Sequence, residues 1–330
     1  LQSHQFLIFY DNWKANLQSV LLLLFLSFYN LQIYTFALMK FIKLLLLFFT
    51  LSSCFNTGVK KIDIPISRFD KQFHSITELN YNVKLGELES EFPQLLDYFI
   101  SDVMYIPLSN DSIKRSNIVL FNDNTDVIDF NKEINESYPD VKEISDKLNL
   151  AFGRFLFHFP DAVIPEKTVL LNSYNTTAIN SFDNNLVVGL EFYLLDKNSF
   201  INDVYEYQKV RYDRKYMIAD ALEFWLSSSF WNSNEINNFQ DELIFKGKIM
   251  YLIHQFIPEE ELDVVFRFSK EVLMWCSVSE HNIWNEIMKL ELMYSEDVEK
   301  YYSFFNSAPF TRGMPKESPG RLGNWVGYQI

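Results

Sequence analysis

The sequence has little glycine and little cysteine, with nine Gly and two Cys among its 330 residues. Two cysteines cannot build the network of disulfides that stabilises small secreted domains. The few glycines form neither Gly-x-x-x-x-Gly-Lys-Ser/Thr nor Gly-x-Gly-x-x-Gly, the loops that hold nucleotide phosphates. The Gly-x-Ser-x-Gly turn of serine hydrolases is also missing. These absences argue against a nucleotide-binding enzyme and a hydrolase of that class, and they predict no cofactor.

Histidine and positive charge are scarce as well. The five histidines include no His-Glu-x-x-His pair, the spacing that puts two zinc ligands one helical turn apart. No group of cysteines offers a structural zinc site, so we expect no metal. Lys and Arg number 29 against 43 Asp and Glu, which gives a formal net charge of -14. Such a surface repels the phosphates of nucleic acids, so nucleic-acid binding is not expected.

A lipoprotein signal is the clearest positive feature of the sequence. A Met and two Lys over residues 39–43 precede an apolar run, residues 44–51, that is too short to span a bilayer. A Leu-Ser-Ser sequence then leads to Cys54, an order that resembles the bacterial lipobox. We therefore predict a signal peptide over residues 39–53, cleavage between Ser53 and Cys54, and lipidation of Cys54. The lipid, with palmitate as an acyl chain, would anchor the protein to a membrane.

The 38 residues before this signal admit two interpretations. Their apolar residues, interrupted at Asn30 and Gln32, approach the roughly 20 that a transmembrane helix needs. Residues 1–38 are therefore either an over-extended gene start or a real membrane span. A signal peptide with its own Met and charges gains nothing from a span before it, which favours the over-extended gene start. Residues 54–61 are predicted to be a tether and residues 62–330 a single globular domain.

The apolar pattern predicts an α+β domain that is mostly α. Strands are predicted over residues 62–69, 167–174 and 186–193, with a turn at Asn184-Asn185. Helices are predicted over residues 85–100, 141–157, 216–231, 241–256, 259–275 and 280–294. This order puts a small central sheet before a C-terminal helical half.

Few residues are candidates for chemistry. Asp220 and Glu223 lie three positions apart on the predicted helix 216–231, where they could share a face. Paired carboxylates can act as general acid and base, although two solvated acids on a helix are far commoner. Cys276 lies in an apolar run, and we expect it to be a buried hydrophobic side chain rather than a nucleophile.

The C-terminal segment is the most unusual part of the sequence. Its candidate packing or docking residues are Glu317, Ser318, Pro319, Gly320, Arg321, Gly323, Trp325 and Gly327. Ser318-Pro319 fits the start of a helix on which Gly323 and Gly327 would form one smooth strip. Such a strip lets another backbone approach closely. We expect tight packing inside the domain, and the functional alternative is a groove for a partner protein.

Several of these pieces resemble one known family. These pieces are the lipobox at Cys54, residues 186–194, the helix around Gly247-Lys248 and above all residues 308–310 and 317–330. Together they resemble the gliding-motility lipoprotein GldB family of Bacteroidetes. The resemblance implies a lipoprotein needed for gliding and for its associated secretion machinery. More distantly, the family is similar to zincin-type peptidases with a His-Glu-x-x-His helix. The equivalent helix, residues 216–231, contains no histidine, so the resemblance implies a degenerate zincin-like fold without the metal.

Residues and resemblance together predict a non-enzymatic lipoprotein of the cell envelope, facing the periplasm and anchored in the outer membrane. It would act through contacts with other gliding or secretion machinery proteins. One alternative is an envelope peptidase or hydrolase with an unrecognised site near Asp220 and Glu223. Another is a lipoprotein that binds a small ligand. Bound metal would favour the hydrolase, and a deep apolar pocket with convergent polar groups would favour ligand binding.

Overall fold

The computed structural model describes residues 59–194 and 205–330. Several predicted features lie outside the described residues. They are the segment before residue 39, the signal peptide, its cleavage site at Cys54 and most of the tether. Residues from Val59 to Ile330 belong to one structural unit.

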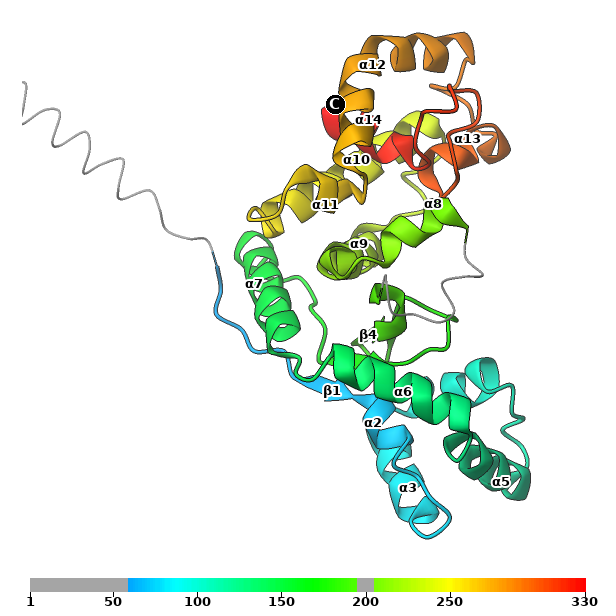
Figure 1. The fold of residues 1–330 in the computed structure, drawn as a ribbon. Helices are drawn as coiled ribbons and strands as arrows, with labels where there is room; N and C mark the ends of the chain where they lie inside the picture. The colour runs from blue at the N-terminus through cyan, green and yellow to red at the C-terminus, as the bar shows by residue number, and fades with distance from the viewer. Residues whose placement is uncertain (1–58, 195–204) are drawn as a thin grey trace, which may run out of the picture. The chain divides into compact units, whose positions relative to one another are not determined.

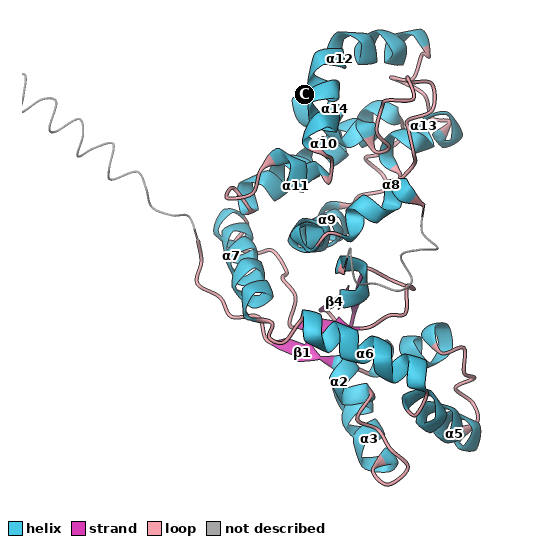
Figure 2. Cartoon of the chain, viewed as in Figure 1, coloured by secondary structure: helices cyan, strands magenta, loops and turns pink. Residues whose placement is uncertain are grey.

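Helices make up most of the described chain, and a small sheet lies among them (Figure 2). The strands are β1 (Ile66–Arg68), β2 (Thr168–Leu171), β3 (Ile179–Phe182) and β4 (Asn185–Gly189). The helices before β2 are α2 (Phe69–Phe73), α3 (Tyr81–Glu91), α4 (Pro93–Tyr98), the π-helical turn Phe99–Val103, α5 (Asp111–Asn122), α6 (Thr125–Ser137) and α7 (Lys142–His158). The helices after β4 are the 3-10 turn Leu190–Tyr193, α8 (Glu206–Lys209), the 3-10 turns Val210–Tyr212 and Arg214–Tyr216, α9 (Met217–Phe230), α10 (Phe239–Phe256), α11 (Leu262–Phe266), α12 (Lys270–Lys289), α13 (Val298–Phe305) and α14 (Leu322–Gln329). The predicted class, α+β and mostly α, is confirmed.

The sheet is mixed and has the strand order β1-β2-β4-β3. Strands β1, β2 and β4 are parallel, and β3 pairs antiparallel with β4. Asp183 and Asn184 connect β3 to β4 with φ angles of 51° and 58°, the left-handed conformation that a two-residue hairpin turn requires. The turn therefore lies one residue earlier than the sequence predicts.

The two faces of the sheet belong to two hydrophobic cores. Side chains alternate along a strand, so Val187 of β4 faces one core and its neighbour Val188 faces the other. Helices α2 to α5 cover the first face, and α6, α7, α9 and the C-terminal helices cover the second. Figure 1 shows α2, α3 and α5 on one side of β1 and α7 and α9 on the other. Because β2 and β4 are buried on both faces, both have almost continuous apolar sequences.

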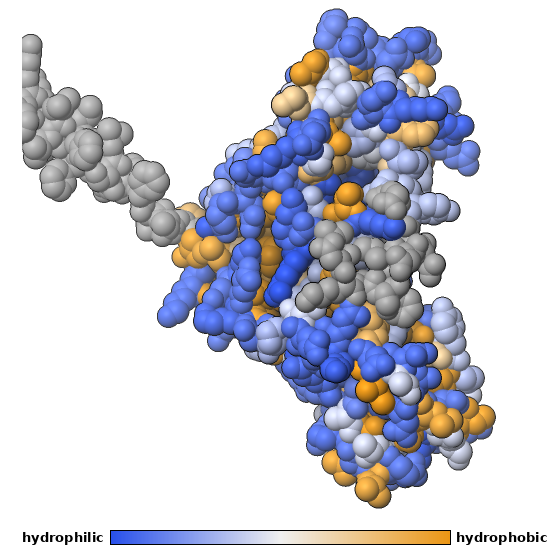
Figure 3. Space-filling model, in the orientation of Figure 1, coloured by the Kyte–Doolittle hydropathy of each residue, from blue (hydrophilic) through white to orange (hydrophobic). Residues whose placement is uncertain are grey.

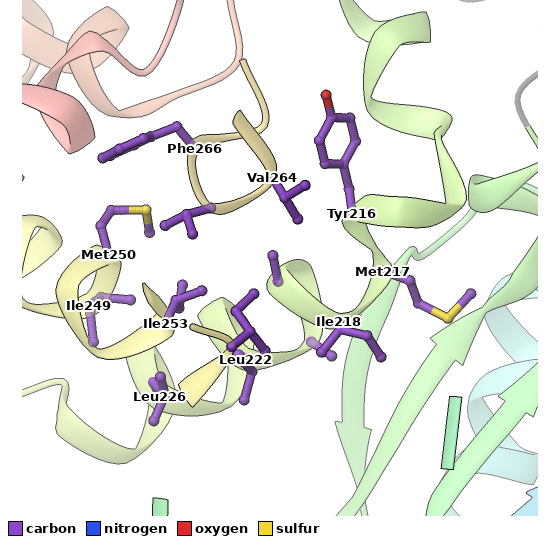
Figure 4. Packing of buried hydrophobic residues seen from close by; sticks show 14 of the residues in the cluster. Tyr216, Met217, Ile218, Leu222, Leu226, Ile249, Met250, Ile253, Val264 and Phe266 are labelled. Atoms are coloured by element: carbon purple, nitrogen blue, oxygen red, sulfur yellow. The ribbon is translucent and has the colours of Figure 1, made fainter. Parts of the chain in front are cut away.

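Helix α9 is central to the second core. Leu222 and Leu226 lie one helical turn apart and pack toward Ile253 of α10, with side chains of α11 completing the cluster (Figure 4). Helix α9 also contacts α7 and strands β3 and β4. Its hydrophobic residues fix its position, and Asp220 and Glu223 therefore have fixed positions beside the core.

Several predicted helix boundaries are wrong. The helix predicted over residues 259–275 is divided, because Arg267 has a φ of 56° and ends α11 in the left-handed conformation. Helix α12 then begins at Lys270 and includes most of the helix predicted over residues 280–294. The last helix begins at Leu322 rather than at Ser318-Pro319, because Arg321 has a φ of 60°.

The surface is largely hydrophilic on the face shown in Figure 3, and hydrophobic side chains gather near α3 and α5. Val83 of α3 and Leu120 of α5 are among the exposed hydrophobic residues. Across residues 59–194 and 205–330, no helix has the length and apolar character needed to cross a bilayer.

Candidate functional site

A group of buried charged side chains lies beside α9. Asp220 and Glu223, the carboxylates selected from the sequence, have side chains only 11% and 18% exposed. Three arginines surround them, and the side chains of Arg267 and Arg321 are 1% and 8% exposed. The third arginine, Arg211, is more accessible, with 32% of its side chain exposed. These five residues are called the ion cluster below.

The arginines connect the two carboxylates. The Nε of Arg267 lies 2.9 Å from Oδ1 of Asp220, and its Nη2 contacts Oε2 of Glu223. The Nη2 of Arg321 donates to both carboxylate oxygens of Glu223, at 2.6 Å and 2.5 Å. The Nη2 of Arg211 donates to Oδ1 of Asp220 at 3.2 Å. The cluster is thus one network that joins α9, the end of α11 and the start of α14.

Charge pairing keeps Asp220 ionised. Burial alone would raise the pKa of Asp220, but Arg267 and the other two arginines outweigh this effect, and the pKa lies below its usual value. The hydroxyl of Tyr193 also donates to Oδ2 of Asp220 at 3.1 Å. Burial lowers the pKa of Arg267 and of Arg321 to about 9, so both are protonated at neutral pH. Three cations and two carboxylates leave one formal positive charge in the cluster.

Two of the arginines have an uncommon backbone conformation. Arg267 follows α11 with a φ of 56°, and Arg321 precedes α14 with a φ of 60°. A left-handed conformation costs a residue other than glycine about 1–3 kcal/mol, so surrounding contacts must hold it. The guanidinium of Arg267 donates from Nη1 to the carbonyl of Val265, and that of Arg321 is held by Glu223. Backbone strain therefore coincides with the ion cluster.

Sequence reasoning found part of this cluster. It selected Asp220 and Glu223 as a possible catalytic pair and Arg321 as part of a separate C-terminal motif. The structure joins the two hypotheses, because Arg321 binds Glu223. Arg211 and Arg267 were not selected. One signal was available for Arg267, which interrupts the apolar run Val-Val-Phe-Arg-Phe, where a cation without a partner would be costly.

Most of the other residues in the C-terminal motif lie inside the domain. The hydroxyl of Ser318 accepts a hydrogen bond from the backbone N–H of Thr311 at 3.1 Å. The carbonyl of Pro319 accepts one from the Thr311 hydroxyl at 2.6 Å. Trp325 is buried, whereas Glu317 is exposed. These contacts hold the loop that leads into α14.

The glycines of the motif lie against three different neighbours. A Cβ atom on Gly327 would lie 2.0 Å from a carbonyl oxygen of α10, and one on Gly323 would lie 2.5 Å from a phenylalanine ring of α13. A Cβ atom on Gly320 would lie 2.4 Å from the carbonyl oxygen of Ala308. The single strip expected on one helix is thus divided, and each glycine contacts an element of the same domain.

The remaining candidates offer no reactive group. Cys276 is buried in α12, and burial raises the pKa of the Cys276 thiol to about 12, so the thiol is protonated at neutral pH. Within the described parts of the chain, no three His, Cys, Asp or Glu side chains are grouped so that they could hold a metal ion.

The chain is similar to a known protein family. No curated protein and no solved structure matches the chain significantly. The family model described as gliding motility protein GldB matches residues 55–330, a range that includes the ion cluster and the C-terminal motif. Because this match extends over most of the sequence, the chain belongs to the GldB family of gliding-motility proteins.

Proposed function

We propose that the protein is a non-enzymatic lipoprotein of the cell envelope that serves gliding motility through protein–protein contacts. Membership of the GldB family supports the role in gliding. The Leu-Ser-Ser sequence before Cys54 supports lipid anchoring. In this proposal the lipid holds the domain at the outer membrane, facing the periplasm. There the domain contacts other proteins of the gliding or secretion machinery.

The ion cluster carries the non-enzymatic part of the proposal. A general acid needs a pKa near the working pH, and a general base needs a carboxylate that can accept a proton. The lowered pKa of Asp220 makes this side chain a poor general acid and a weak general base at neutral pH. Every oxygen of Asp220 and Glu223 is already contacted by an arginine or by the Tyr193 hydroxyl. This arrangement supports a structural role, in which the carboxylates neutralise the buried arginines.

Replacement of Cys54 tests the anchor in the native organism. We expect Cys54→Ser to abolish incorporation of labelled fatty acid, to release the protein from the membrane fraction and to stop gliding. Melting of the released protein should match that of the wild type, because the domain itself is unchanged. A Cys54→Ser protein that still sediments with membranes and still incorporates fatty acid would contradict the lipoprotein proposal.

The hydrolase alternative is tested at Asp220. Asp220→Asn keeps the side-chain shape and removes the charge that pairs with Arg211 and Arg267. If Asp220 is structural, gliding should fall only as far as the amount of folded protein falls. A variant that is abundant, folded and unable to support gliding would instead favour an enzymatic role.

Affinity purification of the lipidated wild-type protein from its own envelope would identify the partners that the proposal requires.

A further inference from the structure

A cavity of 810 Å³ lies next to the ion cluster, between the segment around α8, the turn from α11 to α12 and the loop before α14. This volume lies within the range of small-molecule binding sites. All three arginines of the cluster line the cavity, whereas its two carboxylates are not among the described lining residues. The cationic side of the network therefore faces the open space.

The lining has an excess of positive charge. Its cationic residues are Lys209, Arg211, Lys215, Arg267, Lys270 and Arg321. Its acidic residues are Asp213, Asp263 and Glu271, half as many. This excess is local, because the whole chain has a formal net charge of -14. A cavity with such walls attracts anions and concentrates them near the arginines.

Four buried nitrogen atoms of these arginines make no hydrogen bond within the described chain. Two of them, Nε and Nη2 of Arg267, are ion-paired with Asp220 and Glu223. The other two are Nη1 of Arg321 and Nε of Arg211. The Arg321 side chain is more than nine-tenths buried and lines the cavity. A buried donor without a partner is uncommon in native proteins and indicates a water molecule, an ion or a ligand group nearby. Repulsion from Arg211 adds to the effect of burial on Arg321, and an anion between them would relieve it.

We propose that this cavity binds a small organic ligand through an anionic oxygen group, a carboxylate or a phosphate, held by Arg211 and Arg321. Guanidinium groups bind both anions through charge-assisted hydrogen bonds. Nη1 of Arg321 and Nε of Arg211 are the two nitrogen atoms that the described chain leaves without a hydrogen bond for such a group. Phe266, Phe268 and Val272 also line the cavity and provide an apolar surface for the rest of the ligand. The proposal stands independently of the lipid anchor and of the role in gliding.

Binding of simple anions to the full-length protein in neutral detergent tests this site. Inorganic phosphate and acetate serve as separate probes, in titration calorimetry at constant ionic strength and without chloride. We expect one of them to bind at one site per chain with a Kd of about 1 mM or tighter, the strength expected from two or three charge-assisted hydrogen bonds. The better probe shows whether the ligand carries phosphate or carboxylate.

Matched variants locate the bound anion. Arg211→Gln should weaken binding about tenfold or more, because it removes one charge-assisted contact. Arg115→Gln is the control, since Arg115 pairs with Glu78 at 2.8 Å, has a similar side-chain exposure of 38% and does not line the cavity. The Arg115→Gln protein should bind the anion with the same affinity as the wild type.

A third variant covers the case in which Arg211→Gln does not fold. Lys270 lies on the exposed rim of the cavity, with 68% of its side chain accessible, so Lys270→Gln should fold normally. It should weaken binding about threefold through the loss of one nearby charge. The absence of saturable binding for both probes would overturn the proposal. Binding that neither Arg211→Gln nor Lys270→Gln weakens would overturn it too.

Discussion

Glu191, which follows β4, is a fully buried acid whose surroundings differ from those of Asp220. Its Oε1 accepts hydrogen bonds from the backbone N–H groups of Ser173 and Asn175, at 2.9 Å and 3.0 Å, and from the Ser173 hydroxyl. Burial nevertheless raises the pKa of Glu191 to about 7, because these hydrogen bonds offset only part of the lost hydration. The pKa values of the two buried acids are therefore shifted in opposite directions, upward for Glu191 and downward for Asp220.

The raised pKa makes stability depend on pH. Between about pH 4.5 and 7 the folded state binds more protons at Glu191 than the unfolded state, so the contribution of Glu191 to stability is lost as pH rises through this range. A shift of this size corresponds to about 3 kcal/mol. Glu191→Gln cannot ionise, so we expect its unfolding free energy relative to the wild type to increase by about 3 kcal/mol between pH 4.5 and 8.

Urea unfolding of both proteins at several pH values measures this difference. His74 has a lowered pKa, so its own contribution to stability increases with pH. Because His74 is present in both proteins, its effect cancels when the two are subtracted. A difference that stays constant from pH 4.5 to 8 would show that Glu191 has an ordinary pKa.

Residue-level reasoning from the sequence succeeded where the neighbours along the chain decide the environment. The apolar run around Cys276 was enough to predict a buried thiol, and Cys276 is fully buried. The partners of Asp220 and Glu223 could not be predicted in this way, because Arg321 is 98 positions from Glu223 in sequence. Only the fold brings these charges together, and their pairing determines whether a carboxylate is reactive or structural.

Helices α10 and α14 pack more closely than ordinary side chains allow. A Cβ atom on Gly247 of α10 would lie 2.1 Å from the carbonyl oxygen of Gly327, and one on Gly327 would lie 2.0 Å from that of Leu243. These neighbours are backbone atoms of regular helices and cannot move independently. Because Gly247 and Gly327 have no side chains, the last helix can lie in direct backbone contact with α10.

Gly327→Ala should separate the two helices and lower the unfolding free energy by about 3 kcal/mol or more, through overpacking. Gly86 of α3 provides the matched control, because nothing lies within 4 Å of the position where its Cβ would be. Gly86→Ala should raise stability by about 0.5–1 kcal/mol, since alanine favours the helix. Chemical denaturation measures whether the unfolding free energy falls for Gly327→Ala and rises for Gly86→Ala. A Gly327→Ala protein as stable as the wild type would contradict the close contact.

Whether a helix or strand could be predicted from the sequence depended on the length and regularity of its apolar pattern. The helix predicted over residues 216–231 is observed as Met217–Phe230, because its apolar positions recur over several turns. Strand β3 was not predicted, since Ile-Asn-Ser-Phe is short and has no continuous apolar face. The break at Arg267 was missed because its left-handed conformation depends on contacts that no local pattern contains.

At the scale of the whole molecule, the sheet is the structure that both cores share. Strand β4 contributes Val187 to the core covered by α2 to α5, and Val188 to the core covered by the C-terminal helices. The order of elements in the sequence predicted a small sheet and a helical half, but not that helices cover both faces. The zincin-like part of the prediction stays a prediction, because no solved structure matches the chain significantly.

A shared sheet predicts that the two cores unfold together. Val187→Ala and Val188→Ala remove the same two methyl groups on opposite faces of β4, so each should lower stability by about 2 kcal/mol. Five of the six tryptophans lie between residues 225 and 325, so fluorescence reports on the C-terminal core, whereas circular dichroism reports on all helices. For both variants the two signals should change at one denaturant concentration, as in a two-state transition. If Val187→Ala shifted the circular dichroism transition and left the fluorescence transition unchanged, the N-terminal helices would unfold independently and the sheet would not couple the cores.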